Sequence, residues 1–152
     1  MSELDDAEMT TWAALMGVVL WLPGKLDGAL KAHGLSHHEF QIIWWLSLSD
    51  TGTRTMGDLA GTASVTPSHL SRIAARLETR GWIVRRPDPA DARYTLASLT
   101  EDGSRKLAEC APDYYATVRE HLFDRLSPEQ AGELGAITTT ILHSVNPECR
   151  PR

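Results

Sequence analysis

The spacing of apolar residues predicts two helices at the start of the chain. From about residue 8 to residue 33, apolar side chains recur at three- and four-residue steps, which places them on one face of a helix. Pro23 lies inside this stretch and cannot donate to the helical ladder, so we expect a kink or a division there. Gly34 fits a helix C-cap, and Ser36 with Glu39 forms a capping box that begins the next helix.

The next stretch has the pattern of a helix-turn-helix. In the helix that begins after Ser36, one apolar face carries Phe40, Ile43 and either Leu46 or Ser47, and Trp44-Trp45 lie outside it. After a turn at residues 50–53, a short helix begins at Thr55, and a second helix is expected over 67–80, with Thr66 as its N-cap and Gly81 as its C-cap. Two short helices joined by residues 61–65 indicate a helix-turn-helix.

Beyond residue 81 the period changes. Residues 82–84 and 94–99 have the pattern of two strands, and the loop 87–91 between them contains two prolines, so we expect a β-hairpin wing. A helix then runs from Thr100 to about residue 122, with a kink expected at Pro112, and a last helix begins at Ser127. The predicted fold is mainly α, with a small β-hairpin.

The helix at 67–80 has two different faces. The side chains of Leu70, Ile73, Ala74 and Leu77 fall on one side and are expected to be buried. The opposite side carries Ser68, Arg72, Ala75 and Thr79, flanked by Ser71 and Arg76. Small hydroxyls beside a long guanidinium suit a helix that enters the major groove of DNA, where an arginine forks onto guanine. An ordinary amphipathic surface helix would show the same pattern.

The predicted hairpin supports the DNA-binding interpretation. Arg85, Arg86 and Arg93 lie where a wing would meet the DNA backbone or a minor groove. Asp91 is unsuited to contact DNA, and we interpret it as an intramolecular partner that fixes the direction of an arginine. His69, near the start of the helix at 67–80, is a further candidate for a base or phosphate contact.

Composition and charge agree with a small globular DNA-binding protein. The chain has 152 residues, of which 42% are hydrophobic and 23% charged, enough for a core of its own. The net charge is -5, yet residues 54–106 contain nine basic and six acidic side chains. A basic middle on an acidic body suits a protein that presents one face to phosphate, although chance clustering on a solvated surface is the alternative.

Several of these segments together resemble the MarR family of bacterial regulators. The resemblance rests on SVTPSHLSR at 64–72, LETRGWI at 77–83 and above all DARYTLASLTEDG at 91–103. It implies a winged helix-turn-helix homodimer whose N- and C-terminal helices pack together, with two recognition helices in successive major grooves of a pseudo-palindromic operator. It also implies repression relieved by a small aromatic or phenolic ligand. The predicted DNA-binding residues are Thr66, Ser68, His69, Ser71, Arg72, Arg76, Arg85, Arg86, Asp91 and Arg93.

The resemblance also suggests a division of the chain and a ligand site. Residues 1–152 form a single domain, in which 1–35 and 104–152 are the helical dimerisation region and 36–103 the winged helix-turn-helix lobe. For the effector we expect an apolar pocket. Its candidate residues are Trp12, Trp21, Asp27, His38 and Trp45, with Trp21 the first choice. The alternative is that the tryptophans fill the core and the dimer seam. Trp44-Trp45 and Leu22-Pro23 depart from the family pattern near this place.

Other functional classes have less support. His37-His38-Glu39 lacks the spacing of a zinc protease motif, so we expect no enzyme and no cofactor. We expect no metal site, because Cys110, Cys149, His121 and His143 do not have ligand spacing. Two alternatives stay open: a winged-helix module for protein contact or architecture without sequence readout, and a thiol-based redox-sensing regulator. We interpret Cys110 as a packing residue of the dimer helices, facing Tyr114.

The sequence gives no reason to expect a membrane protein. The most apolar stretch, Trp12 to Leu22, is too short to cross a bilayer and is followed by Pro23-Gly24. The N-terminus lacks the pattern of a signal peptide, so we expect a cytoplasmic protein.

Overall fold

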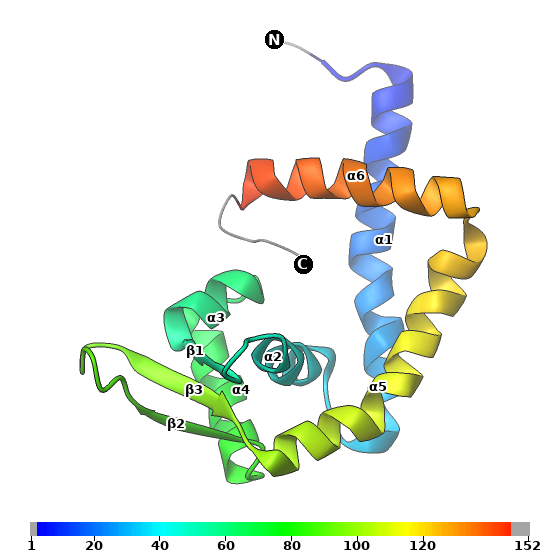
Figure 1. Cartoon of the computed structure of the whole chain (residues 1–152). Coiled ribbons are helices and arrows are strands. Elements are labelled where there is room, and N and C mark those ends of the chain that lie inside the picture. The colour runs from blue at the N-terminus through cyan, green and yellow to red at the C-terminus, as the bar shows by residue number, and fades with distance from the viewer. Residues whose placement is uncertain (1–2, 147–152) are drawn as a thin grey trace.

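The computed structural model describes residues 3–146 and has two parts (Figure 1). Three long helices, α1, α5 and α6, form an open frame, and the remaining elements form a lobe at one end of it. The elements are α1 (Asp6–Leu30), η1 (Lys31–His33), α2 (His37–Ser47), β1 (Thr53–Thr55), α3 (Met56–Thr62), α4 (Pro67–Thr79), β2 (Ile83–Pro87), β3 (Thr95–Leu99), α5 (Glu101–His121), η2 (Phe123–Arg125) and α6 (Pro128–Val145). The fold is mainly helical with a small antiparallel sheet, as predicted.

Helix α1 is more continuous than its sequence suggested. Asp5 caps its N-terminus in a capping box with Glu8, and the helix continues through Pro23 to Leu30. The expected division at Pro23 is therefore wrong. A proline removes only one donor from the ladder, and the hydrogen bonds on either side are kept. The end is as predicted: after the 3-10 turn η1, Gly34 adopts a left-handed φ of 70° and closes the helix.

Helix α2 is the central helix of the lobe. Its capping box of Ser36 and Glu39 is present as predicted, and Phe40 and Leu46 are buried. Ile42 is also fully buried, and the Trp44-Trp45 pair, expected outside the apolar face, is partly buried against the core. The reason is that α4, α5 and β3 all pack around α2, so that more than one face is covered. Periodicity within one helix does not contain this information.

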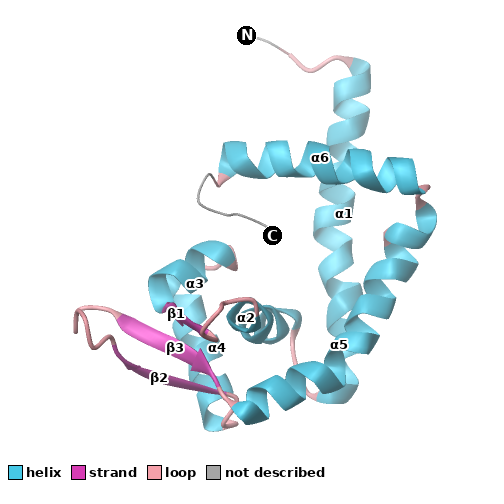
Figure 2. Cartoon of the chain, viewed as in Figure 1, coloured by secondary structure: helices cyan, strands magenta, loops and turns pink. Residues whose placement is uncertain are grey.

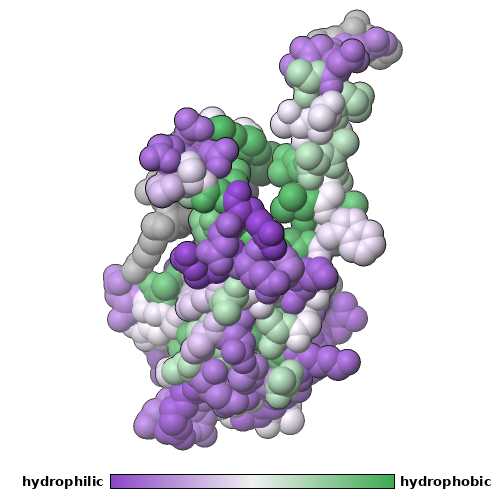
Figure 3. All heavy atoms as spheres, turned by 90° about the vertical axis from the view of Figure 1, so that its right-hand side faces the viewer, coloured by the Kyte–Doolittle hydropathy of each residue, from purple (hydrophilic) through white to green (hydrophobic). Residues whose placement is uncertain are grey.

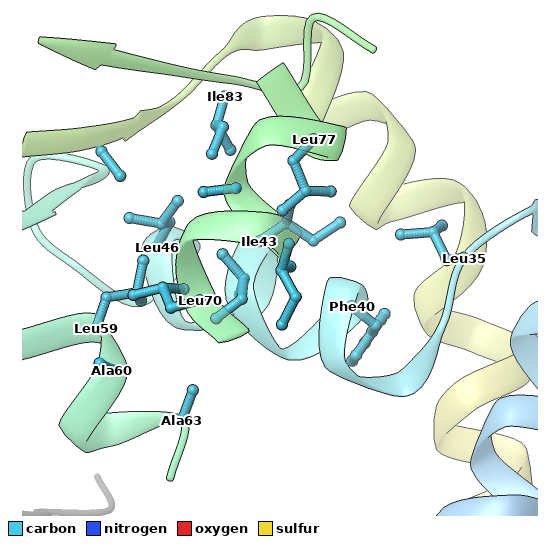
Figure 4. Packing of buried hydrophobic residues seen from close by; sticks show 14 of the residues in the cluster. Leu35, Phe40, Ile43, Leu46, Leu59, Ala60, Ala63, Leu70, Leu77 and Ile83 are labelled. Atoms are coloured by element: carbon cyan, nitrogen blue, oxygen red, sulfur yellow. The ribbon is translucent and has the colours of Figure 1, made fainter. Parts of the chain in front are cut away.

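The core of the lobe lies between α2 and the helix-turn-helix (Figure 4). Leu70, Ile73, Ala74 and Leu77 of α4 are all buried, which confirms the predicted inner face of this helix. Leu70 and Leu77 lie beside Ile43 of α2, with Leu59 of α3 nearby. The turn between α3 and α4 contains Ser64 at a φ of 54°, in the left-handed region that tightens the connection.

The predicted hairpin is present, but it belongs to a sheet of three strands (Figure 2). Strands β2 and β3 pair antiparallel from Ile83↔Leu99 to Pro87↔Thr95. The sequence did not predict β1, whose three residues pair with the other edge of β3 and give the order β1-β3-β2. We expected the turn at 50–53 to include Thr53, which instead begins β1. Three residues are too few for an alternating pattern to identify a strand.

Helix α5 connects the lobe to the frame. It continues unbroken through Pro112 and changes direction along its length (Figure 1). Its first half packs on the lobe, where Gly103 and Cys110 are buried. Cys110 lies on α5 but faces the core cluster of the lobe, against which Tyr114 also packs. The side chain of Cys110 serves packing, as we predicted.

The frame helices carry many exposed apolar side chains. Among the described residues of α1 only Leu26 and Leu30 are buried, and α6 has no buried residue in this chain. Figure 3 shows hydrophobic atoms along the stalk formed by α1, whereas hydrophilic atoms prevail at the opposite end of the molecule. Residues 6–33 form a helix long and apolar enough to cross a membrane. The expectation that the apolar stretch at the start of the chain is too short to do so is therefore wrong. One such helix near an N-terminus is weak evidence for a membrane span.

Candidate nucleic-acid interface

Helix α4 presents a narrow polar face to solvent. Thr66 accepts a hydrogen bond from the backbone of His69 at 3.2 Å, and Pro67 occupies the first turn, as predicted. Ser68, Ser71 and Arg72 are exposed along the outer side of the helix. In the part of the chain that the structure describes, Arg72 makes no ion pair, so its guanidinium donors are available to a ligand. This face has the shape and the donors that the major groove requires.

The loop of the wing is built around one ion pair. Arg93 donates to both carboxylate oxygens of Asp91, with Nη2 2.6 Å from Oδ2 and Nε 3.0 Å from Oδ1. These hydrogen bonds lower the pKa of the Asp91 carboxyl, which stays ionised. The Arg93 side chain is still 84% exposed. The predicted role of Asp91 as an intramolecular partner is therefore confirmed, and the pair fixes the direction of Arg93 at the tip of the wing.

The two arginines of β2 have different surroundings. Arg85 donates from Nη2 to Oε2 of Glu78 at 2.8 Å, and its backbone N–H donates to the same carboxylate at 2.9 Å. This contact ties the wing to the end of α4. Arg86 is exposed and makes no ion pair among the described residues. Of the two, Arg86 has the freer side chain.

A polar hollow of about 290 Å³ lies between α4 and the wing. Ser71 lines it from α4, Arg85 and Thr95 from the two strands, and Arg93 with Tyr94 from the loop. Guanidinium and hydroxyl groups converge there from elements far apart in the sequence. Such a donor set suits a phosphate group of a nucleic-acid backbone.

We also predicted that Arg76 and His69 bind DNA. In the structure, both side chains contact residues of α2. The Nε of Arg76 donates to Oε1 of Glu39 at 2.9 Å. The ring of His69 lies 5.2 Å from the ring of His38, measured between centroids. Both residues thus have intramolecular partners, and their contact with DNA stays a prediction. No signal in the sequence pointed to the pairing of Arg76 with Glu39, which is 37 residues away.

The structure does not gather the predicted ligand residues around one cavity. Trp12 and Trp21 are exposed on α1, whereas Trp45 packs against the core of the lobe. Asp27 accepts a hydrogen bond at 2.6 Å from the backbone N–H of the residue before His38, so it holds the start of α2. Asp27 also lines a hollow of about 390 Å³ between α1 and α2, to which none of the three tryptophans contributes.

The sequence analysis missed an apolar groove of about 530 Å³ between α1 and α6. Leu15 and Val19 line it from α1, and Ile141, Leu142 and Val145 line it from α6. The lining residues of α1 and those of α6 are more than 100 residues apart in the chain, so only the fold brings them together. The exposed apolar spacing of both helices was the signal that could have indicated it.

The thiol and metal alternatives find little support in the described residues. Burial raises the pKa of the Cys110 thiol, whereas a redox sensor needs an accessible thiol of low pKa. Cys149 lies outside the described residues. Within residues 3–146 no group of three or more potential metal ligands lies close together, His121 and His143 included.

A helix-turn-helix with an exposed recognition face, followed by an arginine-bearing hairpin, defines a winged-helix DNA-binding protein. Comparison with known proteins agrees. A model of the MarR family matches residues 33–93. The chain is 30% identical to the transcriptional repressor MprA of Escherichia coli K12 over 113 residues, which is 74% of this chain and 64% of MprA. It is 30% identical to the regulator MhqR of Bacillus subtilis over 102 residues, 66% of this chain and 68% of MhqR.

Solved structures extend the likeness to nearly the whole chain. AbsC of Streptomyces coelicolor, a MarR-family regulator, has a TM-score of 0.87 and 30% identity, and the match covers 95% of this chain and 98% of AbsC. Sco3205 of the same organism, solved in complex with DNA, has a TM-score of 0.88 and 33% identity, covering 95% and 91%. The chain therefore belongs to the MarR family of transcriptional regulators, as the motifs at 64–103 predicted.

Proposed function

We propose that this chain is a sequence-specific regulator that binds double-stranded DNA as a homodimer. Helix α4 enters the major groove, where Ser68, Ser71 and Arg72 read base edges, and the wing places Arg86 and Arg93 at the backbone and the minor groove. The observation that carries the proposal is the outer face of α4, on which small side chains surround an unpaired arginine beside the polar hollow of the wing. The DNA complex of the relative Sco3205 supports it.

The frame helices support the dimer. A single chain leaves apolar side chains of α1 and α6 exposed on both sides of the groove between them. Burying such a surface against a second copy is favourable in proportion to the area removed from water. A symmetric pair of chains also supplies two copies of α4, as recognition of a two-fold operator requires.

Selection of duplexes from a random pool by the purified protein tests this function. We expect a pseudo-palindrome whose half-sites lie about one helical turn, roughly 34 Å, apart. The affinity for this duplex should fall steeply as salt rises, because phosphate contacts release counterions. Recovery of no preferred sequence, or an affinity independent of salt, would contradict the proposal and favour a protein-contact module.

We further propose that the regulator is a repressor and that a small aromatic or phenolic ligand releases it from DNA. The repressor MprA supports the first part by its likeness to this chain. The hollow beside Asp27 supports the second, because it lies where the frame helix α1 meets the lobe. A ligand wedged there would alter the placement of α4 relative to the dimer.

Titration with simple phenolic acids such as salicylate tests the ligand. We expect saturable binding of the acid, measured by calorimetry, together with a loss of affinity for the selected duplex. The Asp27→Asn variant should keep its affinity for DNA. The ligand concentration that releases half of the bound DNA should differ from that of the unmodified protein. If no phenolic acid binds or changes the affinity for DNA, the effector proposal is wrong, while the DNA-binding proposal is unaffected.

A further inference from the structure

The first turn of α2, residues 36–39, lies between the frame and the recognition helix. On one side, Asp27 of α1 accepts a hydrogen bond from the backbone N–H of His37 at 2.6 Å. On the other side, the carboxylate of Glu39 reaches Arg76 of α4 at 2.9 Å. A single helical turn therefore joins the helix that carries the dimer groove to the helix that faces DNA.

Glu39 is a buried carboxylate with several donors around it. Its side chain is only 6% exposed. Oε2 accepts from the backbone of Ser36 at 2.9 Å and lies 3.8 Å from Nη1 of Arg80, while Oε1 accepts from Arg76. Burial alone would raise the pKa of this carboxyl, but the hydrogen bonds from Ser36 and Arg76 outweigh it, so the pKa lies below its ordinary value. The group is ionised at neutral pH.

The capping box alone does not account for a buried charge at this position. The described residues contain two further capping boxes, in which Glu8 caps α1 and Gln130 caps α6. Both of those side chains are exposed, and Gln130 makes the same hydrogen bond without any charge. The charge and the burial of Glu39 therefore serve its contacts with α4.

These contacts add directional constraints on the orientation of α4 to the packing of its apolar face. Packing of leucine and isoleucine side chains is non-directional, whereas a charge-assisted hydrogen bond has a preferred direction. Arg76 lies one helical turn after Arg72, on the same side of α4. Arg80, one turn further, donates to the carbonyl of Gly34 at 2.7 Å and covers the ring of Trp82 at 5.0 Å. Holding both arginines thus sets the direction in which Arg72 points.

We propose that Glu39 is a positioning residue for sequence recognition: by holding Arg76 and Arg80 it fixes the recognition helix to the first turn of α2, and through Asp27 to the frame. This inference rests on the proposed function, since it concerns how the chain distinguishes one duplex from another. It also reassigns Arg76, which the sequence suggested as a direct DNA contact, to the support of α4.

The test compares the full-length protein with its Glu39→Gln variant on two duplexes, the sequence recovered by selection and a scrambled sequence of equal length and composition. Glutamine keeps the capping hydrogen bond, as Gln130 does, but cannot hold two guanidinium groups. We expect the affinity ratio between the two duplexes to fall about tenfold, the size of a lost hydrogen bond to a charged group. Binding to the scrambled duplex should stay constant or tighten, because two arginines are released near the phosphates.

The matched control is Glu101→Gln, which removes the same charge from a side chain that is 88% exposed on α5. It should leave the ratio unchanged. Three results for Glu39→Gln would overturn the positioning role. Both duplexes could bind more weakly by the same factor, as a loss of folded protein predicts, or more tightly by the same factor, as a simple charge effect predicts. The third such result is an affinity ratio that does not change. If the unmodified protein itself has no preference, the proposed function fails, and this inference fails with it.

A double-mutant cycle separates support from direct contact. If Arg76 acts through Glu39, then Arg76→Gln lowers the ratio by about the same factor, and the double variant lowers it no further. If Arg76 contacts phosphate instead, Arg76→Gln weakens binding to both duplexes, reduces the salt slope by about two units because the dimer carries two copies of Arg76, and adds to the effect of Glu39→Gln. The second result would return Arg76 to the DNA interface and contradict the inference.

Discussion

At the scale of residues, the partners of each arginine distinguish its role. Arg93 is held by Asp91 and Arg85 by Glu78, so these guanidinium groups have fixed directions and fewer free donors. Arg72 makes no ion pair in the described part of the chain and projects from a face of small side chains. A free guanidinium can fork onto a guanine, whereas a held one is better suited to a phosphate at a fixed place.

Removal of Arg72 and removal of Arg93 should have different consequences. We expect Arg72→Ala to cost about 1–3 kcal/mol on the selected duplex and to relax the preference at one base pair in each half-site. Arg93→Ala should weaken binding to all duplexes by a similar factor and lower the salt slope. Affinity measurements on a set of single-base operator variants check both. An equal loss of discrimination in the two variants would contradict this division.

Gly103 is required by a close approach of two backbones. A Cβ atom added there would lie 2.1 Å from the carbonyl oxygen of Trp82, which accepts the hydrogen bond from the backbone of Thr100 that joins the start of α5 to the start of β2. We expect Gly103→Ala to lower the free energy of unfolding by about 2 kcal/mol or more, because backbone must move. Urea denaturation measures it. Gly57→Ala is the control, since a Cβ at Gly57 meets no atom within 4 Å and a helical alanine is favourable.

At the scale of elements, one histidine ties the end of α1 to α5. Nδ1 of His33 lies 3.1 Å from Oε1 of Glu109, and Nε2 lies 2.7 Å from Oδ2 of Asp113. Ionised carboxylates only accept hydrogen bonds, so the ring can donate to both of them only in its protonated, imidazolium form. The hydrogen bonds to Asp113 and Glu109 raise the pKa of His33 above its ordinary value.

This link should make the stability depend on pH. Because the pKa of His33 is raised in the folded chain, its contribution is complete below about pH 6.5 and is lost as the pH rises through the folded-state value. We expect the free energy of unfolding to fall over this range in the unmodified protein and to change less in His33→Gln. Burial lowers the pKa of His37 below its ordinary value of 6.5. Its effect on stability therefore falls below pH 6.5, outside the range in which His33 acts. Equal pH profiles for the two proteins would contradict the role of His33.

At the scale of the whole molecule, the chain has a polar end and an apolar end. The lobe has a closed core and carries the arginines, whereas the helices of the frame leave a groove that no part of the described chain fills. A surface of this kind is stable in water when it is shared with another copy. In the proposed function, DNA binding and self-association would therefore use different ends of one fold, joined by α5 and by the start of α2.

A charge placed in the groove should separate the dimer and weaken DNA binding. Val19 lines the groove and is 57% exposed in the single chain, so Val19→Glu leaves the core of the lobe intact. We expect this variant to sediment as a monomer, because burying an unpaired carboxylate costs several kcal/mol, and to lose at least a hundredfold in operator affinity. Ser104→Glu, an exposed change on α5, is the control. A dimeric Val19→Glu with unchanged affinity would show that the groove is not the interface.

Much of the fold and part of the site could be predicted from local signals. Ser36, Thr66, Thr100 and Ser127 begin helices as predicted, since a cap and its partner lie within three residues of each other. The inner face of α4 was also predictable, because burial follows the helical period. Pairs such as Arg76 with Glu39 or His33 with Asp113 were not, because neither member signals its partner along the chain.

The sequence by itself therefore determined where the helices begin, which side of α4 is buried, the Asp91–Arg93 wing and the MarR motifs, all of which depend on neighbours a few residues away. The tertiary structure decided the rest: that Pro23 does not divide α1, that β1 joins the sheet, that Cys110 lies in the core, and that Arg76 pairs with Glu39. These outcomes depend on packing between segments far apart in the chain. The free energy of such a contact depends on the partner segment, which the residues within a few positions do not reveal.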